Sequence, residues 1–234
     1  MFSSKLFPPR HAVLALWMAL TCAAALAAGT DQLQATLDRM DRAAAGFKGL
    51  SADLTQVSHT AVLNMDEAFT GSMKVRRFKH ELGAVVDIQP PNAKKVLLTR
   101  HEVKMYYPKN NSVQIFDLDR KDAHLINQFW LLGFGSDSAE LRNSYKLELG
   151  GPETVAGQKT VRLVLTPKSA DVLAQLTKVE LWISDTLGIA VQQKFWEPGD
   201  DYIVATYTNV KLNPGPPELK WDIPKDAHKE ILNK

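Results

Sequence analysis

The sequence is short of cysteine, of net charge and of long apolar runs. Only one of its 234 residues is cysteine, which excludes a small domain held together by disulfides. The 28 basic and 26 acidic side chains leave a formal net charge of +2, which argues against a strongly basic nucleic-acid-binding protein. Hydrophobic residues make up 45% of the chain, too large a share for intrinsic disorder. The chain is long enough to bury a sizeable core.

The N-terminal segment has the features of a secretory signal peptide. Lys5 and Arg10 precede an acid-free, mostly apolar run of about 17 residues, which is short of the roughly 20 that a membrane-spanning helix needs. Ala25 and Ala27 form a cleavage site of the Ala-x-Ala kind. We therefore predict a cleavable signal in residues 1–27 and a mature protein in the periplasm. An uncleaved membrane anchor is the alternative.

Cys22 lies inside this predicted signal peptide. A lipoprotein signal would place Leu and a small residue ahead of an acylated cysteine, and Ala19 and Thr21 stand at those positions instead. Cleavage would remove the cysteine together with two basic residues. The mature chain, 28–234, would then carry 26 basic and 26 acidic side chains and no net charge. No later apolar run reaches membrane-spanning length, so we expect a soluble single domain that favours apolar cargo over a polyanion.

Hydrophobic periodicity predicts one helix followed by many short strands. The helical spacing is carried by Leu33, Leu37, Met40, Ala44 and Phe47. After Gly49 the period changes to two, and Gly, Pro, Asn and Asp mark the turns, including Gly150-Gly151-Pro152. About 10–11 strands are expected, over approximately 50–55, 69–75, 84–88, 94–99, 103–107, 112–117, 145–149, 161–165, 179–183, 189–196 and 202–210. This pattern predicts an α+β, mainly β fold with an antiparallel sheet curled toward a barrel.

Two segments interrupt the strands. The run from Leu125 to Gly135 is too apolar for a solvated loop, and it predicts a short helix that ends at Gly133 and lays aromatic side chains on the sheet. A second short helix is expected from Ala170 to Leu176.

Motifs that would carry catalysis are scarce. The six histidines form no HExxH pair, and a surface position is the favoured interpretation for them. Asp117, Asp119 and Asp122 lack the glycine and the distal glutamate of a calcium loop. The Gly133–Ser136 segment matches neither a nucleophile elbow nor a phosphate loop. We therefore expect no enzyme, no metal and no cofactor, while a lipid hydrolase with scattered carboxylates remains an alternative.

Arg77 raises a question of burial. Counting by two along the strand that begins at Phe69 places the Arg77 guanidinium on the apolar face. Burial there without a partner would cost several kcal/mol, so the guanidinium must meet acceptors or a cavity mouth. The alternative is a bulge or strand end that turns Arg76 and Arg77 to solvent. The alternation of side chains alone favours neither of these two orientations of Arg77.

The order of several short motifs resembles that of the LolA-type periplasmic carriers of outer-membrane lipoproteins. The motifs follow the signal peptide and the amphipathic helix over nearly the whole mature chain. They are Phe47-x-x-Leu50-x-Ala52-x-Leu54-Thr55-Gln56, Gly71-Ser72-Met73-Lys74-Val75-Arg76-Arg77, Tyr106-Tyr107-Pro108, Leu163-Val164-Leu165-Thr166-Pro167-Lys168 and a closing strand Leu219-Lys220-Trp221-Asp222-Ile223-Pro224. The chain departs from the family at Phe78, where a proline is usual, and at His101-Glu102, which replaces an Asp-Gly turn.

The resemblance implies a strongly curved, incomplete antiparallel barrel whose concave face is covered by helices. Lipoprotein acyl chains would lie in the apolar cavity between them, and Arg77 would bond to backbone carbonyls of the helical lid. The lid would be the first helix and the segment around 129–134. Flexible thioethers such as Met65, Met73 and Met105 suit irregular chains. The residues expected to touch lipid or lid are Arg77, Leu50, Leu54, Met73, Val75, Val103, Met105, Tyr107, Phe129, Trp130 and Phe134.

The expected function is that of a monomeric, non-enzymatic carrier. It would take lipoproteins from an inner-membrane transporter and pass them to an outer-membrane acceptor, with no nucleic acid involved. Two alternatives keep the same fold: a periplasmic lipid or envelope-stress sensor or structural module, and a membrane-anchored lipoprotein acceptor.

Overall fold

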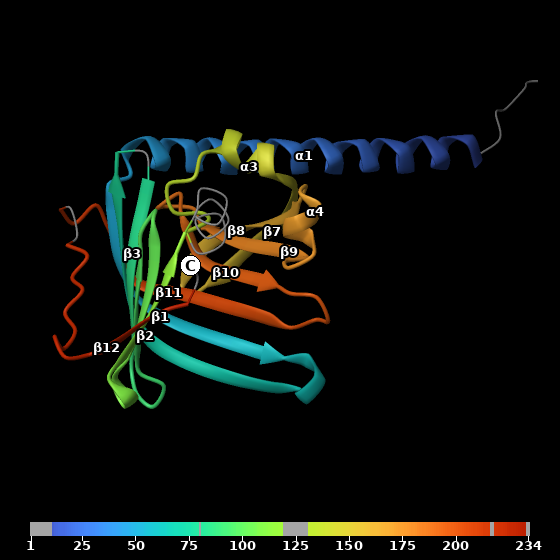
Figure 1. Ribbon diagram of the computed structural model, residues 1–234. Helices are drawn as coiled ribbons and strands as arrows, with labels where there is room; N and C mark the ends of the chain where they lie inside the picture. Colours follow the sequence, from blue (N-terminus) through green and yellow to red (C-terminus); the bar gives the residue numbers. More distant parts are fainter. Residues whose placement is uncertain (1–10, 80, 119–130, 216–217, 233–234) are drawn as a thin grey trace, which may run out of the picture.

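The computed structural model describes residues 11–79, 81–118, 131–215 and 218–232. One large curved sheet makes up most of it, and the long helix α1 (His11–Gly46) lies across the sheet (Figure 1). The other helices are short: η1 (Ala61–Leu63), η2 (Pro108–Asn110), α3 (Ser138–Ser144) and α4 (Ala170–Leu173). None of the helices in the described residues is long and apolar enough to cross a membrane.

The sheet has twelve strands in the order β12-β6-β5-β4-β3-β2-β1-β11-β10-β9-β8-β7. Their bounds are β1 (Gly49–Thr60), β2 (Met65–Phe78), β3 (Glu81–Ile88), β4 (Lys94–Leu98), β5 (Glu102–Tyr107), β6 (Ser112–Asp117), β7 (Tyr145–Val155), β8 (Gln158–Pro167), β9 (Lys178–Ser184), β10 (Ala190–Trp196), β11 (Tyr202–Leu212) and β12 (His228–Ile231). Neighbouring strands are antiparallel except β12, which runs parallel to β6. The outer strands β12 and β7 do not pair, so the sheet stays open, and the predicted α+β fold with a curved, mainly antiparallel sheet is confirmed.

Three details of the predicted strands are wrong. The expected closing strand from Leu219 to Pro224 has no strand structure, and the chain instead closes with β12, which sequence periodicity did not predict. Gly150-Gly151-Pro152 is not a turn between strands. It lies within β7, where the pairing register with β8 shifts between Leu149 and Gly151. The two glycines therefore mark a bulge, which glycine accommodates as readily as a turn.

The core lies mainly on the concave face of the sheet. One cluster packs residues of the four strands β1, β2, β3 and β4 against the end of α1, and it includes Phe47, Leu50 and Val75. A second cluster packs Leu37 and Met40 of α1 against inward-facing residues of β8 and β9. The predicted amphipathic face of the first helix is thus its buried face. α1 itself begins at His11, and it runs without a break from the predicted signal peptide into the predicted first helix.

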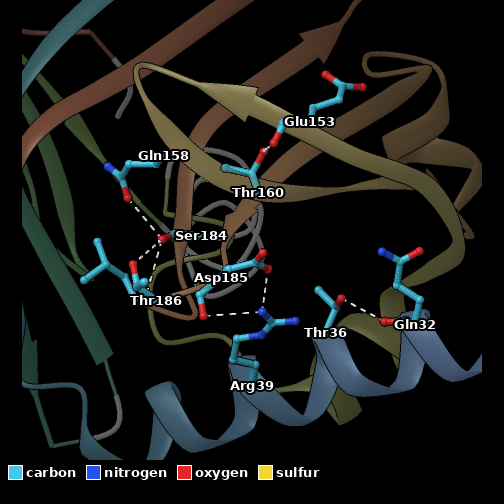
Figure 2. A network of polar contacts seen from close by, with 10 residues as sticks. Gln32, Thr36, Arg39, Glu153, Gln158, Thr160, Ser184, Asp185 and Thr186 are labelled. Atoms are coloured by element: carbon cyan, nitrogen blue, oxygen red, sulfur yellow. Dashed lines mark hydrogen bonds and ion pairs between the residues drawn. The ribbon is translucent and has the colours of Figure 1, made fainter.

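Polar contacts fix α1 on the sheet. Figure 2 shows Arg39 reaching from α1 to the turn between β9 and β10, where Nη1 donates to the Asp185 carboxylate (2.5 Å) and to its backbone carbonyl (3.3 Å). The same turn is braced by the Ser184 hydroxyl, which bonds to Gln158 (3.0 Å) and lies 3.1 Å from the Thr186 hydroxyl. Gly188 of this turn has a φ of +67° and lies against the Arg39 backbone, where a Cβ would come within 2.7 Å of the carbonyl oxygen. The turn therefore requires glycine to let the helix approach.

The end of α1 and the start of β1 are joined by one asparagine. The Asn213 side chain donates to the Gly46 carbonyl (2.8 Å) and accepts from the amides of Lys48 (2.7 Å) and Gly49 (3.2 Å). Asp41 links α1 to α3, because its carboxylate accepts from the Ser138 amide (2.6 Å) and hydroxyl (2.7 Å). These bonds satisfy groups that a helix terminus leaves unpaired.

Of the two predicted short helices, one is present and one falls largely outside the described residues. α4 occupies the first part of the predicted helix 170–176. The predicted helix of 125–135 is described only from Leu131 on, where the chain forms turns and bends. Phe129 and Trp130 lie outside the described residues.

Candidate functional site

A cavity of about 290 Å³ opens on the concave face of the sheet. Its walls come from β1, β2 and β3 on one side and from β10 and β11 on the other, with the residues just after α4 at one margin. The lining residues are Leu54, Gln56, Met73, Val86, Gln175, Leu176, Gln193, Phe195, Glu197, Ile203, Ala205 and Tyr207. This size is close to the lower end of the roughly 300–1,000 Å³ typical of small-molecule sites.

Strand parity explains why these side chains face the same space. Alternate residues of a strand point to the same face, so Ile203, Ala205 and Tyr207 of β11 all project inward. The pairing registers place Ala205 opposite Gln56 of β1 and opposite Gln193 of β10. The cavity is therefore built by three adjacent strands at one level of the sheet, and the curvature of the sheet brings Met73 and Val86 to its far wall.

The floor of the cavity holds a buried polar pair. The Tyr207 hydroxyl donates to the side-chain oxygen of Gln193 (2.8 Å), and Gln193 in turn donates to the backbone carbonyl of Leu132. Both side chains are buried, and burial raises the pKa of Tyr207 well above its ordinary value of 10.0. The pair thus remains uncharged at neutral pH, and it connects the cavity to the loop 131–136.

That loop covers the inner core next to the cavity. Phe134 is fully buried and meets the Tyr207 ring edge to face, with centroids 5.0 Å apart. The backbone of Gly133 accepts from the Ala190 amide of β10 (3.1 Å), and its own amide donates to the Ser136 hydroxyl (3.3 Å). Loop 131–136 is therefore hydrogen-bonded to the sheet.

Arg77 makes a further connection to this loop. Its Nη2 donates to the Gly135 carbonyl (2.7 Å), and its Nε donates to the Phe47 carbonyl at the end of α1 (3.1 Å). The Phe47 ring lies 5.7 Å from the guanidinium carbon. Gly135 has a φ of +68°, and a Cβ there would come within 2.5 Å of Arg77 Nη2. The guanidinium is therefore turned inward onto backbone carbonyls, whereas Arg76 lies over the Phe78 ring at 4.9 Å.

The structure brings together many of the residues that the sequence singled out. Leu54 and Met73 line the cavity, while Leu50, Val75 and Phe134 belong to the buried cluster beside it. Val103 and Met105 pack against the same cluster. Tyr107 is half-buried on β5 and does not line the cavity, its hydroxyl lying 3.7 Å from the Met105 sulfur. Met65 is exposed beside η1 at the end of the β1–β2 hairpin, away from the cavity lining.

The half of the cavity that β10 and β11 provide was not predicted from the sequence. Gln193, Phe195, Ile203, Ala205 and Tyr207 were expected only as parts of strands. The alternation of Ile203, Ala205 and Tyr207 could have identified an inward face. Among the described residues, no group of three or more histidine, cysteine, aspartate or glutamate side chains is placed to hold a metal ion.

No family model and no curated protein sequence matches this chain. Solved structures do. An uncharacterized conserved protein from Thermus thermophilus superposes with a TM-score of 0.52 at 15% identity, over 87% of this chain and 99% of that protein. MucB superposes with a TM-score of 0.52 at 14% identity over 86% of this chain, which spans 65% of the MucB chain. The Mycobacterium tuberculosis lipoprotein LppX gives 0.49 at 14% identity, over 81% of this chain and 99% of that one.

At this level of identity, the first two likenesses show the fold alone. They show that this chain shares the overall fold of those two proteins.

Proposed function

We propose that this chain is a periplasmic carrier that holds the acyl chains of lipoproteins in the cavity on its concave face. It would receive them from an inner-membrane transporter and deliver them to an outer-membrane acceptor, without a catalytic step. The observation that carries the proposal is the apolar cavity between β1–β3 and β10–β11, in a fold of the LolA-like kind. Leu54, Met73 and Ile203 supply apolar walls of the kind a hydrocarbon chain requires.

The energetics favour a protein in this role. Covering an acyl chain is worth about 0.8 kcal/mol per CH₂ group, so a chain of about 16 carbons involves about 12 kcal/mol. Such a chain does not leave a membrane for water at a useful rate. A carrier must therefore offer an apolar surface at each stage. The loop 131–136, which Arg77 holds through the Gly135 carbonyl, would form part of a cover that keeps water from the cargo.

The test measures how much radiolabelled lipoprotein the protein transfers through aqueous buffer from inner-membrane vesicles to outer-membrane vesicles. Ala205 lies on the cavity floor, so Ala205→Phe should fill the cavity and reduce transfer at least tenfold. Val204 is the next residue and points to the other face of β11, so Val204→Phe is the matched control and should transfer normally.

Two results would contradict parts of the proposal. Wild-type protein that binds the lipoprotein but moves none of it is not a carrier, and the cavity would then serve a sensor or structural module. Equal transfer by the Ala205→Phe and Val204→Phe variants would show that the cavity does not hold the cargo. Circular dichroism of both variants establishes that each is folded.

A further inference from the structure

The lining of the cavity includes an acidic residue but no basic one. Of its twelve lining residues, seven are apolar, three are glutamine and one is tyrosine, and the only charged one is Glu197. Among the described residues, no lysine, arginine or histidine lines the cavity. A ligand in this cavity therefore meets carboxamides and one carboxylate, with no cation to neutralise a negative group.

Two basic residues that lie close along the chain to cavity residues are held on the opposite face of the sheet. Lys194 alternates with the cavity residues Gln193 and Phe195, and its amino group lies 3.7 Å from the Trp196 ring centre and 3.5 Å from that of Tyr202. Lys178 also stands over Trp196, at 4.5 Å. These cation–π contacts keep both ammonium groups on the convex face, away from the cavity.

Glu197 lies at the cavity margin with its charge uncompensated. It follows β10 directly and is exposed, whereas Gln193 at the cavity floor is buried. Its backbone amide donates to the Asp201 carbonyl (2.8 Å), but its carboxylate makes no hydrogen bond or ion pair with the described residues. Gln56 and Gln175 are the other polar residues at this more exposed margin. The mouth therefore combines one free carboxylate with two carboxamides.

This arrangement ranks head groups by charge. An anionic head would approach an unpaired carboxylate, and nothing in the described lining would offset the repulsion. A neutral amide or ester can exchange hydrogen bonds with Gln56 and Gln175. An ammonium can pair with Glu197. We propose that the site takes acyl or alkyl chains attached to neutral or cationic head groups, and disfavours chains that end in an anion, such as free fatty acids. This inference rests on the proposed function, because it concerns the same cavity.

The experiment compares three ligands of equal chain length by isothermal titration calorimetry. Dodecylammonium, N-dodecylacetamide and dodecanoate are titrated into the full chain at neutral pH and low salt, below their micelle concentrations. For a carboxylate exposed at the cavity margin, we expect the cation to bind about fivefold more tightly than the anion. The affinity of the neutral amide should lie at least midway between the two. Raising the salt concentration should shrink the difference.

Three variants assign the preference to Glu197. Glu197→Gln should bring the affinities for the cation and the anion within about twofold, and Glu197→Lys should reverse their order. Glu230→Gln is the matched control, because Glu230 is exposed on β12 at the far edge of the sheet. It should leave the preference as in the wild type. Thermal melting establishes that each variant is folded.

The possible failures are distinguishable. If dodecanoate binds as tightly as dodecylammonium in the wild type, or if Glu197→Lys leaves the order unchanged, the inference is wrong while the carrier proposal stands. If none of the three ligands binds the wild type, the cavity is not an acyl-chain site and the proposed function itself fails.

Discussion

At the scale of single residues, two buried tyrosines differ in how their hydroxyls are satisfied. Tyr207 donates to Gln193 on the cavity floor. Tyr145, at the start of β7, is equally buried, but its hydroxyl has no hydrogen-bond partner in the described part of the chain. A buried hydroxyl without a partner costs about 1–3 kcal/mol of stability, whereas a satisfied one contributes about 1 kcal/mol.

The two tyrosine-to-phenylalanine substitutions should therefore shift stability in opposite directions. Tyr145→Phe removes an unsatisfied group and should raise the free energy of unfolding by about 1 kcal/mol. Tyr207→Phe leaves Gln193 without its donor and should lower that free energy by about 1 kcal/mol. Urea denaturation followed by circular dichroism measures both. Destabilisation by Tyr145→Phe would show that the hydroxyl has a partner after all.

Tyr145 also predicts a loss of stability in alkaline solution. Burial, with a smaller contribution from the charge of Glu140, raises the pKa of Tyr145 from 10.0 to about 12. Because the folded pKa exceeds the unfolded one, the native state favours the protonated form. The resulting stabilisation is complete below pH 10 and is lost as the pH rises to about 12. Melting temperatures of the wild type should therefore fall more steeply between pH 10 and 12 than those of Tyr145→Phe. Parallel curves would contradict the assignment.

At the scale of elements, Arg77 connects three parts of the chain. It belongs to β2 and donates to carbonyls at the end of α1 and in loop 131–136. Hydrogen bonds from a charged donor contribute about 1.5–3 kcal/mol each, so the guanidinium has a substantial part in holding this loop.

Removing the Arg77 guanidinium should loosen the loop before it unfolds the sheet. We expect Arg77→Leu to increase amide hydrogen exchange at Phe134 and at Ala190, whose amide donates to Gly133. Lipid retention should change in the same variant. Arg76→Leu is the matched control, because Arg76 contacts the Phe78 ring instead of the loop. Exchange unchanged in Arg77→Leu would show that the loop is held without it.

Elements were predictable where periodicity alone decides them. Alternation along Val179, Leu181 and Ile183 identified β9, and the four-and-three spacing of Leu37 and Met40 identified the buried face of α1. Strand structure near the C-terminus depends instead on a partner. β12 is exposed and lacks a clear alternation, and it is a strand because the edge of β6 pairs with it. The segment 219–224 alternates but pairs with no strand.

At the scale of the whole molecule, the candidate site depends on sheet curvature. Leu54 and Met73 could be predicted as inward-facing from β1 and β2 alone. The other wall, with Phe195 and Ala205, comes from strands more than a hundred residues later in the sequence, and β11 pairs with β1 only in the folded sheet. No local sequence pattern predicts that β11 pairs with β1. The sequence therefore identified one wall of the cavity, and the topology supplied the other.

If the cavity holds acyl chains, native mass spectrometry of protein isolated from its own cells without detergent should detect them as a bound mass. We expect part of the wild-type protein to carry the added mass of an acylated molecule. This population should be absent from Ala205→Phe and kept in Val204→Phe. Wild-type protein found only at its bare mass, or an adduct that persists in Ala205→Phe, would contradict the claim.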